Sequence, residues 1–91
     1  MNLKELRDNI DEIDQKLIGL LEKRFEIVGE IAKLKQSHGL EIEDGNREED
    51  VLANWMNSAD EIETSFLETV VRLVLEYSKD VQSKFNKRRR E

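Results

Sequence analysis

The sequence predicts an all-α protein with three helices per chain, one long, one short and one of medium length. Three observations support this fold class. Charged residues make up 40% of the 91 residues and aromatic residues 5%, and there is no proline, a composition typical of solvated helices. Apolar residues recur at helical spacing over most of the chain. The segments between these runs are short and contain glycine, asparagine, aspartate or serine, as turns do.

The first helix is predicted from about residue 3 to residue 36. At 1.5 Å per residue it would be about 50 Å long, whereas a compact globule of this size is roughly 30 Å across. The helix cannot bury its apolar seam within its own chain, so we infer a partner chain, most simply in a C2 homodimer. The seam has steps of three and four residues, interrupted at Arg24: Leu3, Leu6, Ile10, Ile13, Leu17, Leu20, Ile27, Ile31 and Leu34.

The segment SHGLEIEDGN, residues 37–46, breaks the helical pattern. Gly39 is the expected C-terminal cap of the first helix, because glycine tolerates the left-handed conformation found there. Asn46, followed three residues later by Glu49, has the spacing of a capping box. We therefore expect a second, short helix that starts at Asn46 and continues through Val51, Leu52 and Trp55.

The next turn is expected at residues 56–60, and either Ser58 or Asp60 could cap the third helix. That helix carries apolar residues at Ile62, Phe66, Val70, Leu73, Val74, Tyr77, Val81 and Phe85. The last six residues, NKRRRE, are mostly basic and lack this pattern. We divide the chain into a helical domain, residues 1–85, and a basic tail, residues 86–91, expected to be disordered.

Composition excludes several classes of function. The chain has no cysteine, so neither a disulfide framework nor a thiolate metal site is possible. It has no long uncharged apolar run and no signal-peptide pattern, so we expect a soluble, cytoplasmic protein without membrane contact. The net charge of −6 disfavours nucleic-acid binding.

Polar residues lie on helix faces that are otherwise apolar. Arg24 and Lys35 flank an apolar strip on the first helix, and Ser78 and Gln82 interrupt a similar stripe on the third. The two cations could reach solvent along their aliphatic stems, with Ser78 and Gln82 at the bundle margin. Taken together, however, these residues supply donors without an acid on the same stripe, and burying an unpaired charge is costly. A bound anion is the natural partner.

Arg7 lies beside the seam, 17 residues before Arg24, or about 25 Å along a helix. It cannot readily reach a pocket between Arg24 and Lys35 of its own chain. If two long helices pair antiparallel, Arg7 of one chain approaches the pocket of the other.

Four segments in order, LRDNIDEIDQKLIGLLEKR, IAKLK, DGNREED and YSKDVQ, resemble the all-helical, AroQ-type chorismate mutases, and the resemblance extends from Leu3 to Phe85. It implies an intertwined antiparallel homodimeric helical bundle with two pockets, each taking one arginine from the other chain. It also implies the cofactor-free rearrangement of chorismate to prephenate, a step toward phenylalanine and tyrosine.

The same resemblance implies roles for single residues. Arg24 and the partner's Arg7 would hold the two carboxylates of the substrate, and Lys35 and Gln82 would donate hydrogen bonds to the ether oxygen. A [3,3] shift needs no nucleophile, metal or redox cofactor, so the resemblance implies a site without metal or cofactor. The reaction needs a dianion held in the reactive shape and donors fixed where charge develops.

The resemblance also assigns the remaining wall of the pocket. Asp44, through its backbone, and Glu48 would hold the ring hydroxyl. Ser78 would lie near a carboxylate, and Arg47 would have a supporting role.

Two other functions fit the same sequence. One is a lyase on the same fold that eliminates pyruvate from isochorismate, which requires similar charges. The other is a non-catalytic helical scaffold, in which Arg24, Lys35, Ser78 and Gln82 are exposed or internally paired.

Overall fold

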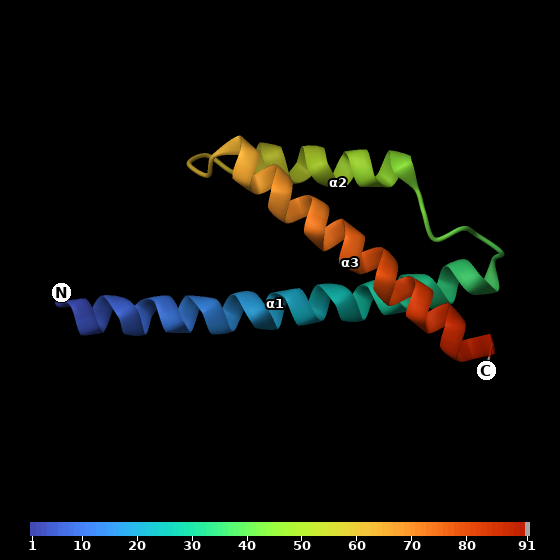
Figure 1. The fold of residues 1–91 in the computed structure, drawn as a ribbon, viewed down its shortest axis with the longest axis horizontal. Helices are drawn as coiled ribbons and strands as arrows, with labels where there is room; N and C mark the ends of the chain where they lie inside the picture. The colour runs from blue at the N-terminus through green and yellow to red at the C-terminus, as the bar shows by residue number, and fades with distance from the viewer. Residues whose placement is uncertain (91) are drawn as a thin grey trace.

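The computed structural model describes the backbone of residues 1–90 and the side chains of residues 1–85. Three helices follow one another: α1, Leu3–Ser37; α2, Gly45–Ser58; and α3, Thr64–Arg90 (Figure 1). Within the described backbone there is no strand. The predicted all-α class and the order long, short, medium are confirmed.

The ends of α1 are capped as its sequence suggests. The side chain of Asn2 accepts a hydrogen bond from the backbone N–H of Glu5 (2.9 Å) at the N-terminus. At the C-terminus Gly39 has a φ of 67°, the left-handed conformation that glycine adopts without steric cost. The N–H of Leu40 then bonds to the carbonyl of Lys35 (2.8 Å), which closes a Schellman motif. The prediction for Gly39 is confirmed.

The predicted start of α2 at Asn46 is wrong by two residues. Asp44 is the N-cap, and its carboxylate accepts a hydrogen bond from the N–H of Arg47 (3.1 Å). Asn46 lies within the first turn. Both residue types cap helices well, but the negative charge of aspartate also interacts favourably with the positive end of the helix dipole.

The predicted turn at residues 56–60 is also wrong, because α2 continues to Ser58. The Ser58 hydroxyl donates to the carbonyl of Asn54 (2.6 Å) and so stays within the helix instead of capping the next one. Neither Ser58 nor Asp60 caps α3, which begins at Thr64.

The backbone of α3 continues to Arg90. The side chains of the tail, residues 86–91, lie outside the described residues, so the division of the chain at residue 85 stays a prediction.

The core is formed where α3 runs back along α2 and then crosses the C-terminal half of α1 (Figure 1). Among the described residues α3 packs on both other helices, which do not pack on each other. The buried apolar side chains come from all three helices: Val28, Ala32, Val51, Leu67, Val71 and Val74. Val71 is fully buried in this small core.

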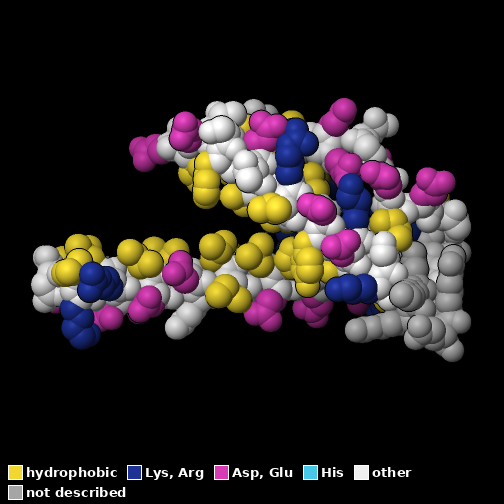
Figure 2. Space-filling view, in the orientation of Figure 1, with side chains coloured by type: hydrophobic (Ala, Val, Ile, Leu, Met, Phe, Trp, Pro, Cys, Tyr) yellow, Lys and Arg dark blue, Asp and Glu magenta, His cyan; other side chains and the backbone are white. Residues whose placement is uncertain are grey.

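The N-terminal half of α1 projects beyond the rest of the chain, and the molecule measures 55 × 27 × 15 Å (Figure 1). Its apolar side chains remain exposed, for example Ile13 at 61% and Leu17 at 54%. Figure 2 shows them as a nearly continuous row on the side of α1 that faces α2. The chain leaves this seam uncovered, as the helix length predicted.

In the part of the chain described here, no helix carries an apolar stretch long enough to cross a bilayer.

Candidate active site

A cavity of about 310 Å³ lies between the C-terminal half of α1, the segment before α2, the first turns of α2 and the middle of α3. Its apolar wall is formed by residues such as Val28, Val51 and Leu75. Seven of the eight residues singled out from the sequence line it: Arg24, Lys35, Asp44, Arg47, Glu48, Ser78 and Gln82. Residues far apart in the chain therefore meet at one site.

Arg24 is held in place by α3. Its Nη1 donates a hydrogen bond to Ser78 Oγ (2.8 Å), and that hydroxyl donates to the carbonyl of Val74 (2.7 Å). Burial, and then the nearby charge of Arg47, lower the pKa of Arg24 from its ordinary value. Among the described residues no carboxylate lies within ion-pair distance of Arg24. The guanidinium is thus fixed, partly desolvated and able to bind an anion.

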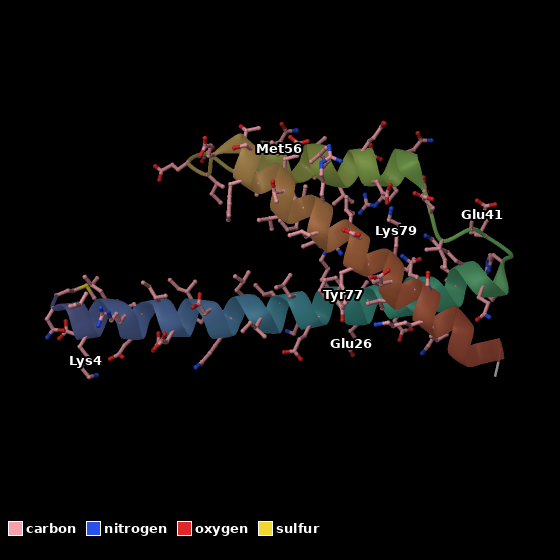
Figure 3. The ribbon with its side chains drawn as sticks, in the orientation of Figure 1. Lys4, Glu26, Glu41, Met56, Tyr77 and Lys79 are labelled. Carbon is pink, nitrogen blue, oxygen red and sulfur yellow. The ribbon has the colours of Figure 1, made fainter. Side chains whose placement is uncertain are left out.

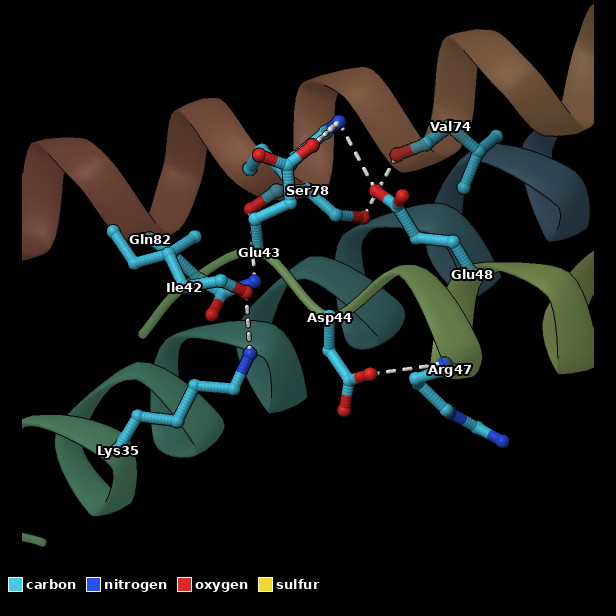
Figure 4. Close-up of polar contacts among 10 residues, drawn as sticks. Lys35, Ile42, Glu43, Asp44, Arg47, Glu48, Val74, Ser78 and Gln82 are labelled. Carbon is cyan, nitrogen blue, oxygen red and sulfur yellow. Dashed lines mark hydrogen bonds and ion pairs between the residues drawn. The ribbon is translucent and has the colours of Figure 1, made fainter. Parts of the chain in front are cut away.

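Lys35 lies in the last turn of α1, where a cation interacts favourably with the helix dipole. Its Nζ donates to the carbonyl of Ile42 (2.6 Å), in the segment that connects α1 to α2 (Figure 4). The ammonium group therefore lies at the cavity wall rather than in open solvent.

Gln82 is 7% exposed, and its amide is only partly satisfied. Its Nε2 donates a long hydrogen bond to the carbonyl of Ser78 (3.4 Å), and its buried Oε1 has no partner among the described atoms. A buried polar atom without a partner is costly and rare in native proteins. This side chain is therefore suited to meeting a ligand.

Asp44 and Arg47 lie at the start of α2. The Oδ1 atom of Asp44 caps the helix by accepting from the N–H of Arg47 (Figure 4). The backbone carbonyl of Asp44 accepts a hydrogen bond from the N–H of Glu48 (3.0 Å). Arg47 is exposed and acts on Arg24 through its charge.

Glu48 lies one residue beyond Arg47 and is partly buried at the cavity wall. Its carboxylate forms an ion pair with Lys79 Nζ at 3.0 Å.

Arg7 is the one predicted site residue that the chain does not bring to its own cavity. It lies exposed on the projecting end of α1, 17 residues before Arg24. The helical rise separates the two by about 25 Å.

Lys79 lines the cavity and was not anticipated from the sequence. Its position on α3, four residues after Leu75 and three before Gln82, puts it on the same helix face and could have indicated it. Hydrogen bonds to Glu48 and Glu43 raise its pKa. It projects from α3 toward the start of α2 (Figure 3).

Comparisons with known proteins identify the family of this chain. The chain matches the family described as chorismate mutase type II over residues 6–83. It is 37% identical to the T-protein of Enterobacter agglomerans over 78 residues, which cover 84% of this chain and 21% of that protein. It is 48% identical to the T-protein of Haemophilus influenzae over 46 residues, covering 50% of this chain and 12% of the relative. This chain thus spans about a fifth or less of either T-protein.

A solved structure has the same fold. A conserved hypothetical protein from Pyrococcus furiosus superposes with a TM-score of 0.72 and 42% sequence identity, covering 88% of this chain and 93% of the other. The family match includes Arg7 and all seven predicted residues of the cavity. On these grounds the chain belongs to the chorismate mutase type II family, and the resemblance drawn from its sequence is confirmed.

Proposed function

We propose that this chain catalyses the rearrangement of chorismate to prephenate, a step in the synthesis of phenylalanine and tyrosine. Membership of the family supports this activity. The observation that carries it is Arg24, a partly desolvated cation held by Ser78 at the wall of a cavity, with no carboxylate partner among the described residues. A cation in that setting is suited to a carboxylate of a small dianion.

Lys35 and Gln82 act on the ether oxygen in this proposal. Negative charge develops on that oxygen as its bond to carbon breaks, and fixed donors stabilise such charge strongly in a partly dry cavity. Lys35 exchanges its contact with the Ile42 carbonyl for the substrate, and the Gln82 amide turns its Nε2 into the cavity. No nucleophile is needed.

The remaining residues orient the substrate. Glu48 and the backbone of Asp44 hold the ring hydroxyl, and Ser78 and Arg47 complete the wall beside the carboxylates. Holding a flexible dianion in its reactive shape contributes to catalysis by removing the entropic cost of reaching it.

A second copy of the chain completes the site. The exposed apolar seam of α1 supports pairing with another α1, because burying it stabilises the pair by about 25 cal/mol for each Å² of apolar surface. In an antiparallel C2 pair the N-terminal half of one α1 lies along the C-terminal half of the other. The partner's Arg7 then reaches the cavity and binds the second carboxylate.

The first test is the loss of chorismate absorbance with purified protein, with acid conversion of the product to phenylpyruvate. Arg24→Ala should lower kcat/KM by about 10²–10³-fold. Arg72→Ala, which removes an exposed arginine paired with Glu68 on its own helix, should leave kcat/KM unchanged. Isochorismate is assayed in parallel. Release of pyruvate from it, without turnover of chorismate, would point to the lyase instead.

A binding measurement separates an enzyme from a helical scaffold. A bicyclic mimic of the transition state should raise the melting temperature of the wild type, because a ligand that binds only the native state stabilises it. No shift at saturating mimic, together with no turnover of either substrate, would favour the scaffold.

A further inference from the structure

Lys79 connects three parts of the chain. It projects from α3 and forms ion pairs with Glu48 of α2 (3.0 Å) and with Glu43 of the segment between α1 and α2 (3.4 Å). It also lines the cavity together with Glu48. Figure 3 shows it in the angle between α3 and the start of α2, and Figure 4 shows the carboxylates of Glu43 and Glu48 turned toward the same point.

The two ion pairs differ in their surroundings. The Glu48 side chain is 29% exposed, whereas that of Glu43 is 71% exposed and its oxygen lies further from the ammonium group. An ion pair between well-exposed groups contributes little, because water and salt screen it. The contact between Lys79 and Glu48 is therefore the stronger of the two.

A glutamate side chain has three rotatable bonds, so a carboxylate at a cavity wall needs a fixed partner to point in one direction. In the part of the chain that the structure describes, Lys79 is the cation paired with Glu48. The contact uses one oxygen, Oε1, of the carboxylate, which leaves Oε2 available to accept a hydrogen bond from a ligand.

We infer that Lys79 is a positioning residue: it holds the carboxylate of Glu48 at the cavity wall, so that Glu48 can bind the ring hydroxyl of the substrate. This inference rests on the proposed function. Lys79 acts through Glu48 and does not itself contact the reacting atoms. Its raised pKa, caused by the hydrogen bonds to Glu48 and Glu43, keeps it a cation through neutral pH.

A contact to the ring hydroxyl is made in the substrate as well as in the transition state, since the hydroxyl takes no part in the bond changes. Removing such a contact raises KM and leaves kcat unchanged. We expect Lys79→Met to raise KM by about fivefold, the upper range for a partly exposed ion pair, with kcat within about twofold. Lys79→Arg, which keeps the charge, should recover most of the wild-type KM.

A double-mutant cycle tests whether Lys79 acts through Glu48. Glu48→Gln alone should raise KM at least as much as Lys79→Met, and the double variant should be no worse than Glu48→Gln. Arg72→Met is the matched control, because Arg72 lies seven residues before Lys79 on the same face of α3 and pairs with Glu68 of its own helix. It should leave KM unchanged. Circular dichroism melts of all variants report their folding.

Several results would overturn this inference alone, given a wild type that turns over chorismate. Three of them concern Lys79→Met: an unchanged KM, a fall in kcat instead of a rise in KM, or a KM rise no larger than that of Arg72→Met. The fourth is a double variant in which the losses of Lys79→Met and Glu48→Gln multiply. The last would mean that Lys79 contacts the substrate directly. A wild type that leaves chorismate unchanged would overturn the proposed function itself, and with it this inference.

Discussion

Mixing two inactive variants should restore activity if each site combines two chains. Arg7 and Arg24 lie about 25 Å apart on one straight helix, so a single chain cannot bring both to one cavity. In the proposed dimer every cavity contains Arg24 of one chain and Arg7 of the other. Arg7→Ala removes one carboxylate anchor from both cavities, and Arg24→Ala removes the other from both.

The size of the recovery follows from the symmetry. Each parent should lose on the order of 10²–10³ in kcat/KM, because truncating one side of a buried charge pair costs about 2–5 kcal/mol. When the two variants re-associate at random in equal amounts, about half of the dimers are mixed. Each mixed dimer has one cavity with both arginines and one with neither. The mixture should therefore reach about 25% of wild-type activity, far above either parent.

The assay follows chorismate absorbance after the two variants have been unfolded together and refolded, with each parent refolded alone for comparison. A second mixture, Arg24→Ala with Lys35→Ala, is the control. These two residues line the same cavity of the same chain, so every cavity in a mixed dimer stays defective and no activity should return. If the first mixture shows only the mean of its parents while wild type refolds to full activity, the partner does not supply Arg7 and the reasoning fails.

Four further results are expected. Lys35→Ala should lower kcat by about 10²–10³-fold in steady-state assays, since a fixed donor at the developing charge is worth about 3–4 kcal/mol. The wild-type kcat should hold from about pH 6 to pH 8, because the Gln82 amide donates at any pH, whereas Gln82→Glu must be protonated to donate and should lose kcat as the pH rises. Val71→Ala should lower the free energy of unfolding by about 2 kcal/mol in urea titrations at a fixed protein concentration, because Val71 is fully buried. The raised pKa of Lys79 means that its ion pairs stabilise the fold below the ordinary lysine pKa and are lost as the pH rises through the raised value, so the difference in melting temperature between wild type and Lys79→Met should vanish there.

The first helix was predictable almost to the residue, and the second was not. The apolar seam of α1 stops at Leu34, and Gly39 follows soon after it, in the left-handed conformation that ends helices. Two signals therefore agree on where α1 ends. Before α2 two signals compete, because Asp44 and Asn46 are both good N-cap residues. An N-cap residue has an extended backbone, and the sequence does not show which of the two adopts it. The end of α2 was missed because the hydroxyl of Ser58 bonds within its own helix, an alternative that the residue type leaves open.

The cavity residues were predictable because helical spacing puts them on defined faces, and the resemblance assigned roles to them. The contacts between them were not. Ser78 bonds to Arg24, and Lys79 pairs with Glu48, only because α3 runs back along α2 and then crosses α1. The crossing depends on packing among residues distant in sequence. Arg7 is the opposite case: helix length alone indicated that it lies far from its own pocket.

The packing of α3 against both other helices means that α3 sets the distance between α1 and α2. Among the described residues α1 and α2 do not pack on each other, so the width of the cavity depends on how closely α3 packs against each of them. A shift of α3 by one turn would move Ser78 and Gln82 about 5.4 Å along its axis, so that they no longer lie opposite Arg24. Changes in the buried valines of α3 could therefore adjust the site to substrates of another size while every polar residue is kept. Altered selectivity in this scaffold should be sought in Val71 and Val74 before the charged residues themselves.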